Sequence, residues 1–144
     1  MTTAVVILVA LLAAATAFGL WRRRTDGRVR AIRGDAARPD TARLGAADGI
    51  DLGPRATLVE FSTAFCQPCR ATRRILAEVA DIVPGVAVVE VDAESNLDLV
   101  RRLGVLRTPT VLVLDSSGVV RSRAVGLPRK AEVVAAVGAV IDSP

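Results

Sequence analysis

An uncharged, apolar run near the N-terminus is the feature that most constrains the architecture of this chain. Residues 4–21 carry no charge, and with Thr2 and Thr3 about twenty residues are available for a helix of roughly 30 Å, the hydrocarbon thickness of a bilayer. Trp21 ends the run, where an indole suits the membrane interface, and three arginines follow it. The pattern predicts an uncleaved transmembrane anchor over residues 1–21.

A cleaved signal peptide and a buried core helix are the alternatives for this run. Ala15 and Ala17 provide the small residues of a cleavage site, but no Lys or Arg precedes the apolar run, as it would in a signal peptide. An arginine triplet is difficult to place directly after a core helix. Basic residues are retained in the cytoplasm, and those near the run all follow it. We therefore expect a single-pass protein with its domain on the cytoplasmic side of the cell membrane, the extracytoplasmic side being the alternative.

The excess positive charge of the chain lies directly after the apolar run. Residues 22–55 hold nine Arg and five Asp, whereas residues 56–144 hold ten basic and ten acidic side chains. Glycine and proline interrupt the first segment repeatedly, so it is predicted to be an Arg-rich juxtamembrane linker outside the core. Its arginines are expected to rest on membrane lipid, and a solvated linker, above all beyond Gly34, is the alternative. Within it, the alternation of residues 28–32 fits a short edge strand. The chain has three Phe and one Trp, too few for base-stacking surfaces, so nucleic-acid binding is not expected.

Residues 56–144 alternate between strand-like and helical patterns, as in an α/β domain. Strand-like runs occupy 57–62, 86–91, 110–114 and 119–125, and helical periodicity marks about 69–83, 95–103 and 129–141. This order predicts a mixed sheet with helices on both faces, in the spatial order 86–91, 57–62, 110–114, 119–125. We expect each helical crossover to join parallel strands, and the apolar run 86–91 to be buried on both faces.

The two cysteines of the chain lie three residues apart, between the first strand and the first helix of this domain. Unpaired backbone N–H groups and the helix dipole stabilise a thiolate at the start of a helix, so Cys66 is expected to be the nucleophile that attacks a disulfide. Cys69, one helical turn further on, is close enough to resolve the mixed disulfide. Pro68 suits the first turn, where its missing N–H is not needed. Half of an intermolecular zinc site and two inert core cysteines are the alternatives.

Three segments together resemble the thioredoxin family. They are T-L-V-E-F-S-T-A-F-C-Q-P-C-R from residue 57, V-V-E-V-D from residue 88 and R-T-P-T-V-L-V-L from residue 107. The resemblance covers about residues 56–142 and implies the thioredoxin fold, with a mixed central sheet and helices on both faces. It also implies that a redox-active Cys66–Cys69 disulfide serves in place of a cofactor, and that no metal takes part.

The resemblance also assigns roles to residues away from the cysteines. Thr108–Pro109 matches the family's cis-proline step, whose backbone binds the substrate chain. Glu60 stands where the family has a buried acid that deprotonates the resolving cysteine, and burial would raise its pKa toward neutrality. A solvated Glu at a strand end is the alternative. Val88 replaces a Lys that often accompanies that acid. The substrate-binding set further includes Phe65, Gln67 and Pro68.

Together these features predict a membrane-tethered thiol-disulfide oxidoreductase that reduces protein disulfides. Its expected partners are a protein or small-molecule disulfide and an upstream thiol reductase or membrane electron donor. A domain outside the cytoplasm would act instead as a disulfide oxidase, an isomerase or a cytochrome-maturation reductase. A third hypothesis is a redox-sensing adaptor with little turnover, which a Cys69→Ser variant would test by trapping one dominant partner rather than many.

Overall fold

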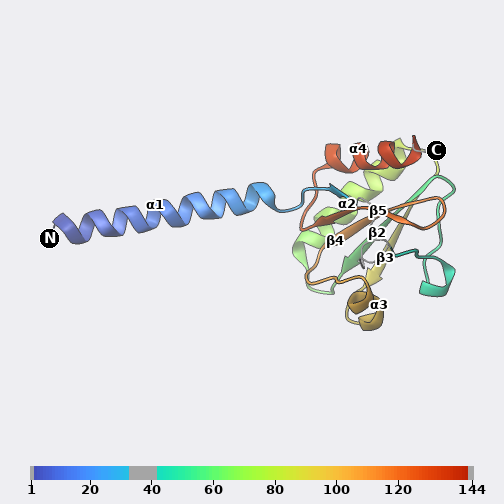
Figure 1. Ribbon diagram of the computed structural model, residues 1–144, viewed down its shortest axis with the longest axis horizontal. Helices are drawn as coiled ribbons and strands as arrows, with labels where there is room; N and C mark the ends of the chain where they lie inside the picture. The colour runs from blue at the N-terminus through green and yellow to red at the C-terminus, as the bar shows by residue number, and fades with distance from the viewer. Residues whose placement is uncertain (1, 33–41, 143–144) are drawn as a thin grey trace.

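A five-stranded mixed β-sheet forms the centre of the structure, a computed structural model that describes residues 2–32 and 42–142 (Figure 1). In chain order the elements are α1 (Thr2–Thr25), β1 (Arg30–Ala31), η2 (Ala46–Asp48), β2 (Ala56–Ser62), α2 (Gln67–Ile82), β3 (Val86–Asp92), α3 (Leu97–Arg102), β4 (Thr110–Asp115), β5 (Val120–Val125) and α4 (Lys130–Ile141). The strands lie in the order β1-β5-β4-β2-β3, which confirms the predicted spatial order of the four longer strands.

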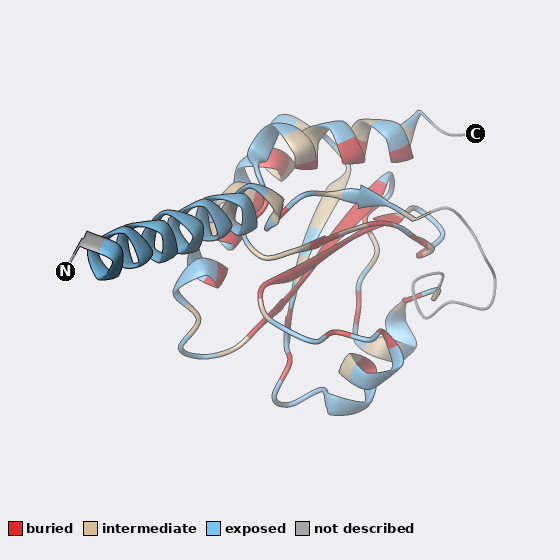
Figure 2. Cartoon of the chain, turned by 60° about the vertical axis from the view of Figure 1, so that its left-hand side comes forward, coloured by how far each residue is buried: buried red, intermediate tan, exposed pale blue. Residues whose placement is uncertain are grey.

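Two helices cover one face of the sheet and a short one lies on the other. Alternate residues of β2 point to the two faces. Ala56 and Leu58 pack with side chains of α2 and α4, whereas Val59 and Phe61 pack with Leu99 and Leu103 from α3 and the residue after it. The predicted arrangement of helices on both faces is therefore confirmed, and the central strands of the sheet consist largely of buried residues (Figure 2).

The expectation that every helical crossover joins parallel strands is wrong for one of the two. β2 and β3 are parallel, joined through α2, but β4 runs antiparallel to β2 and hence to β3. The helix between β3 and β4 is α3, whose six residues span about 9 Å, against about 23 Å for the seven residues of β3. Since α3 is too short to carry the chain back along β3, β4 begins near the end where β3 stops.

The expectation that residues 86–91 are buried on both faces is also wrong. β3 is the outermost strand of the sheet, with a neighbour on one side only. Most of its side chains are partly or fully exposed, and Val88 is 36% exposed. An apolar run thus does not distinguish a central strand from an edge strand that lies under part of a helix.

The segment expected to lie outside the core contributes to it. Leu44 and Ile50 are almost completely buried and pack with Val59 and Phe61. The backbone N–H of Leu44 donates to the carbonyl of Gly118 at 2.8 Å, which fixes the segment beside the turn between β4 and β5. Arg30 and Ala31 form the two-residue edge strand β1 on β5, within the range that the alternation indicated. The domain boundary at residue 56 stays a prediction.

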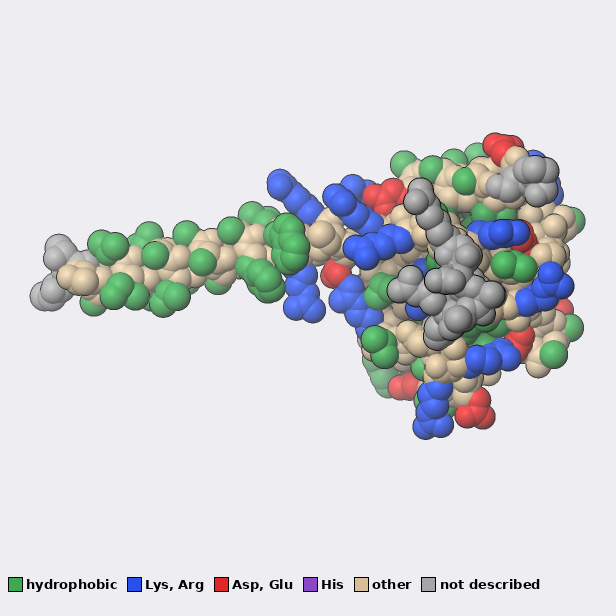
Figure 3. Space-filling view, in the orientation of Figure 1, with side chains coloured by type: hydrophobic (Ala, Val, Ile, Leu, Met, Phe, Trp, Pro, Cys, Tyr) green, Lys and Arg blue, Asp and Glu red, His purple; other side chains and the backbone are tan. Residues whose placement is uncertain are grey.

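The N-terminal helix α1 projects away from the domain (Figure 1). Thr3–Arg22 has a mean hydropathy of 2.5, and none of this stretch is buried in the structure, so it is not a core helix. Hydrophobic side chains follow one another along the visible face of the helix, while Lys and Arg side chains gather where it meets the domain (Figure 3). α1 is therefore long enough and apolar enough to cross a membrane.

Candidate active site

The two cysteines lie at the start of α2, directly after the loop that follows β2. Cys66 is the N-cap residue of the helix, and its sulfur accepts a hydrogen bond from the backbone N–H of Cys69 at 3.2 Å. The two sulfurs form a disulfide. Pro68 lies in the first turn, as expected for a residue without an N–H. The first turn of α2 therefore presents N–H groups and the positive end of the helix dipole to the Cys66 sulfur.

The two cysteines differ in accessibility. Cys69 is 1% exposed and faces the sheet, whereas Cys66 is only half-buried. A substrate can thus reach the Cys66 sulfur but not that of Cys69. A pocket of about 330 Å³ opens beside Cys66 and is lined by Ser62, Thr63, Ala64, Arg70, Arg73, Glu90 and Asp92.

Glu60 is a buried acid without a hydrogen-bond partner. It lies on β2 between Leu58 and Ser62, on the sheet face that α2 covers, and both of its carboxylate oxygens are unpaired. Burial raises its pKa to about 7, the nearby Glu90 carboxylate adds to this effect, and Arg73 opposes it. The alternative of a solvated strand-end Glu is thus wrong. A carboxyl group with a pKa near neutrality both accepts and releases a proton at physiological pH.

Glu90 and Arg73 surround Glu60 and were not indicated by the sequence patterns. Glu90 lies directly opposite Glu60 on the parallel strands β2 and β3. Its carboxylate accepts a hydrogen bond from the Ser62 hydroxyl at 2.6 Å and forms an ion pair with Arg73. Arg73 lies one helical turn after Cys69. One pattern could have revealed the pair of acids, since E-F-S of the first strand and E-V-D of the second align when the two strands run parallel in register.

The loop before β4 brings a proline next to the cysteine helix. The Thr108–Pro109 peptide bond is cis, as the resemblance implied, and the Pro109 carbonyl accepts a hydrogen bond from the backbone N–H of Gly126 at 2.8 Å. Thr108 lies on the β2 side, its hydroxyl 3.5 Å from that of Thr63. A pocket of about 430 Å³ is formed here by Pro68, Thr108, Pro109, Gly126 and Leu127, together with Asp26 and Arg107.

The remaining residues of the predicted substrate-binding set border the cysteine pair. Phe65 is 97% exposed, so its ring projects into solvent, and Gln67 nearby is also exposed. Leu106, which the sequence patterns did not single out, is 96% exposed and precedes the cis-proline by three residues. Two apolar side chains are thus presented on the two loops that frame the site.

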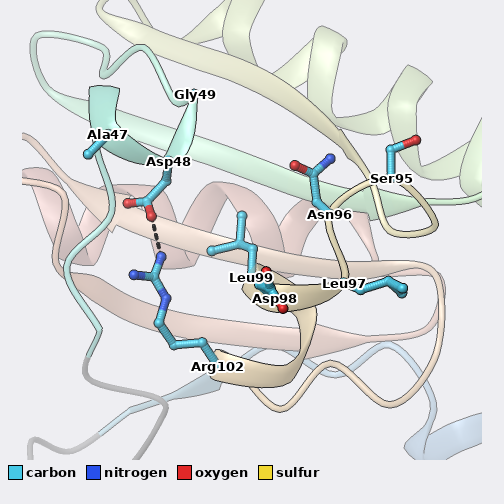
Figure 4. Close-up of a pocket in the computed structure, with 9 residues that line it drawn as sticks. All are labelled: Ala47, Asp48, Gly49, Ser95, Asn96, Leu97, Asp98, Leu99 and Arg102. Atoms are coloured by element: carbon cyan, nitrogen blue, oxygen red, sulfur yellow. Dashed lines mark hydrogen bonds and ion pairs between the residues drawn. The ribbon is translucent and has the colours of Figure 1, made fainter.

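A third pocket lies away from the cysteines. It measures about 560 Å³ and lies between η2 with the residue after it and α3 with the two residues before it (Figure 4). Asp48 and Arg102 form an ion pair across it, and neither cysteine belongs to its lining. Among the described residues, no group of three metal-binding side chains is present, here or elsewhere.

A cysteine pair at the start of a helix, with a half-buried and a buried sulfur and a cis-proline alongside, defines a dithiol–disulfide redox site. Residues 50–139 match the thioredoxin family, and the chain belongs to it. It is 27% identical over 77 residues to thioredoxin from Mycoplasma genitalium, covering 54% of this chain and 74% of that one. Thioredoxin from Chlorobaculum thiosulfatiphilum is 26% identical over 76 residues, 52% of this chain and 70% of its own.

Solved structures agree with this assignment. Chloroplastic thioredoxin z superposes with a TM-score of 0.54 at 26% identity, over 60% of this chain and 79% of its own. A mutant thioredoxin from Halobacterium salinarum has the same fold, with a TM-score of 0.59 at 20% identity over 76% of this chain and 99% of its own. The protein is therefore a thiol-disulfide oxidoreductase whose redox group is the Cys66–Cys69 disulfide, with protein disulfides as substrates and a thiol reductase as partner.

Proposed function

We propose that this protein is a membrane-tethered protein-disulfide reductase whose nucleophile is Cys66. The observation that carries the proposal is that the Cys66 sulfur caps α2 and accepts the Cys69 N–H, while the Cys69 sulfur is buried behind it. In the dithiol form the Cys66 thiolate attacks one sulfur of a substrate disulfide. The substrate S–S bond breaks, a bond forms to Cys66, and the other substrate sulfur leaves and takes up a proton.

Cys69 then resolves the mixed disulfide with Glu60 as the base. Glu60 accepts the thiol proton of Cys69, and the thiolate so formed attacks the Cys66 sulfur and releases the second substrate thiol. Two electrons pass from the dithiol to the substrate, and the Cys66–Cys69 disulfide remains. Support for Glu60 comes from its burial, its unpaired oxygens and a pKa raised to about 7 by that burial.

The substrate chain binds along the cis-proline loop. The backbone of Thr108, before Pro109, is assigned to pair with the chain on one side of the disulfide, and Phe65, Gln67 and Pro68 contact it on the other. The pocket that Pro68, Thr108 and Pro109 share supports this assignment, because it connects the loop to the cysteine helix. The exposed Phe65 provides apolar area for the substrate without first having to move.

α1 anchors the protein, and the domain lies on the cytoplasmic side. The anchor is supported by the length and apolar surface of α1, and the side by the arginines that follow it. In the cytoplasm the glutathione and thioredoxin pools keep dithiols reduced, so the protein works as a reductase there. Electrons reach it from a thiol reductase or a membrane donor.

Two experiments test this function. In intact cells, a membrane-impermeant maleimide should leave Cys66 unlabelled until the membrane is permeabilised, and labelling of Cys66 without permeabilisation would place the domain outside. In detergent solution, the reduced full-length chain should reduce insulin disulfides. The Cys69→Ser variant should instead stop at a mixed disulfide with its substrate, whereas a Ser117→Ala variant, altered at the far turn, should turn over normally.

A further inference from the structure

The end of the N-terminal helix forms part of the wall of the substrate pocket. Asp26, one residue after α1, lines the pocket with Pro68 and Pro109. Its carboxylate forms an ion pair with Arg107, the residue before Thr108. The cis-proline loop, the cysteine helix and the chain leaving α1 thus meet at one site.

Hydrogen bonds hold the residues that follow α1 directly against the domain. The backbone N–H of Gly27 donates to the carbonyl of Val125 at 2.8 Å, and that of Val29 donates to a carboxylate oxygen of Glu132 at 3.1 Å. Gly27 has a positive φ of 75°, and a Cβ there would lie 1.8 Å from the carbonyl oxygen of Leu127. The backbone at Gly27 is thus pressed against the loop that bears Leu127, and the helix is held against the pocket.

This attachment places the pocket at the level of lipid headgroups when α1 spans a bilayer. Asp26 follows Arg22, the last residue of the apolar stretch, by four residues, which is about 6 Å of helix. A headgroup layer is also roughly 6 Å thick. The start of α2 lies on the side of the domain that α1 joins (Figure 1), and basic side chains surround the junction (Figure 3).

Exposed apolar side chains lie on the loops that frame the site. Phe65 and Leu106 project from the two loops of the site, and Leu127 is partly exposed between the cis-proline loop and Gly27. An amphipathic segment lying along a membrane surface presents apolar side chains beside polar backbone groups. Such a segment offers contacts both to this rim and to the backbone of the cis-proline loop.

We propose that the substrate class of this protein is the disulfide of a protein anchored in the same membrane, within a few residues of its own span. The inference rests on the proposed function, because it concerns which disulfide the Cys66 thiolate reaches. Because α1 is attached directly beside the pocket, it fixes the distance between the pocket and the bilayer surface. A disulfide held at that height meets the site at high effective concentration, whereas one carried far above the surface does not.

The test uses the reduced full-length chain in nanodiscs of phosphatidylcholine and phosphatidylglycerol together with model substrates. Each substrate is a single-span peptide carrying the same two-cysteine disulfide loop. In the proximal peptide the loop follows the span directly. In the distal peptide a Gly/Ser spacer of about 20 residues, with a reach of roughly 25 Å, separates the two. The probe of intrinsic reactivity is dithiobis(nitrobenzoate), a small soluble disulfide.

We expect the proximal loop to be reduced at least about tenfold faster than the distal loop. Inserting about 15 Gly/Ser residues between Thr25 and Asp26 adds a reach of roughly 20 Å and should bring the ratio close to one, with the dithiobis(nitrobenzoate) rate unchanged. The same insertion after Pro144 is the matched control and should preserve the preference. Equal rates for the two peptides in the native chain, or a preference that survives the insertion after Thr25, would overturn the proposal that α1 selects disulfides near the membrane. Failure to reduce the proximal peptide, the distal peptide and dithiobis(nitrobenzoate) would overturn the proposed function instead.

Discussion

Two acidic side chains toward opposite ends of the β2–β4 strand pair have pKa values shifted in opposite directions. Asp115 lies opposite Ala56, at the end away from the cysteines, and its carboxylate accepts hydrogen bonds from Ser117 and Val119 and pairs with Arg121. Burial acts to raise its pKa, but these hydrogen bonds outweigh burial and lower the pKa to about 2. Glu60, nearer the cysteines, has no hydrogen bond and a pKa raised to about 7.

The different surroundings of Asp115 and Glu60 point to different roles, one in the stability of the fold and one in proton transfer. The turn around Asp115 provides two backbone N–H groups, a hydroxyl and a guanidinium to a single carboxylate, so its charged form stabilises the fold. Glu60 provides no such benefit, because a buried charge without partners is unfavourable. A buried acid in this state, on the strand that leads into the cysteine loop, fits a role in proton transfer better than a role in stability.

Replacing the nucleophile should reduce activity more than any other change. Cys66→Ser should lower insulin reduction by at least about three orders of magnitude, because a hydroxyl cannot form the mixed disulfide. Asp115→Asn, at the opposite end of the sheet, should stay within about twofold of the native rate when folded. Similar losses of activity in the two variants would contradict the assignment of Cys66 as the nucleophile.

Loss of the base should slow resolution. Glu60→Gln keeps the shape but not the proton acceptor, so the decay of the mixed disulfide should slow by about 10²-fold. In the native chain that decay should accelerate as the pH rises through about 7, where Glu60 becomes ionised, and the variant should show no such rise. Stopped-flow kinetics with a fluorescent disulfide peptide measures both, and an unchanged pH profile in the variant would assign the base elsewhere.

The same acid should make the oxidised protein less stable at higher pH. Its folded pKa of about 7 exceeds the ordinary value of 4.5, so the folded state retains a proton that the unfolded state has released. The free energy of unfolding should therefore fall by up to about 3 kcal/mol between pH 4.5 and 7 and then level off. Glu60→Leu should remove this fall and be more stable than the native chain at pH 8, as urea unfolding in detergent would measure.

Asp115 should show the opposite dependence at lower pH. Its folded pKa lies below the ordinary value of 3.8, so its contribution is present above that pH and is lost as the pH falls toward about 2. Asp115→Asn should cost about 1 to 2 kcal/mol at pH 7, allowing for solvent screening. If Asp115→Asn keeps the native acid dependence between pH 4 and 2, the carboxylate is not the cause.

The smallest expected effect concerns the neighbour of Glu60. Glu90→Gln removes a carboxylate that raises the pKa of Glu60, and leaves Arg73 unneutralised beside it, so the pH profile of resolution should move to lower pH. Glu94→Gln, an exposed acid two residues after β3, is the matched control and should leave the profile in place. A shift to higher pH in the Glu90 variant would contradict the assignment.

Local patterns predicted the site better than they predicted the surroundings. The position of Cys66 at a helix start was predictable from the patterns on either side of it, and the cis bond before Pro109 from the resemblance to the thioredoxin family. The order of the longer strands was predictable from the succession of strands and helices along the domain. The direction of β4 was not, since it depends on the length of α3 in space rather than on its periodicity.

Long-range contacts account for the rest of what the sequence did not reveal. The burial of Leu44 and Ile50 depends on the turn near Gly118, about seventy residues away. The ion pair of Asp26 with Arg107 likewise joins the end of α1 to the cis-proline loop across 81 positions. Neither segment has a periodic pattern, so only the folded arrangement brings these residues together.

The pH dependence of Cys66 reactivity shows whether the start of α2 stabilises the thiolate of this residue. In the full-length Cys69→Ser chain, Cys66 is the only cysteine, and its alkylation by iodoacetamide can be followed from about pH 5 to 10 in nanodiscs. We expect a thiol pKa clearly below the ordinary value of about 8.5, and a return to that value in the urea-unfolded chain. A pKa at or above about 8.5 in the folded chain would contradict the claim that the start of α2 creates the nucleophile.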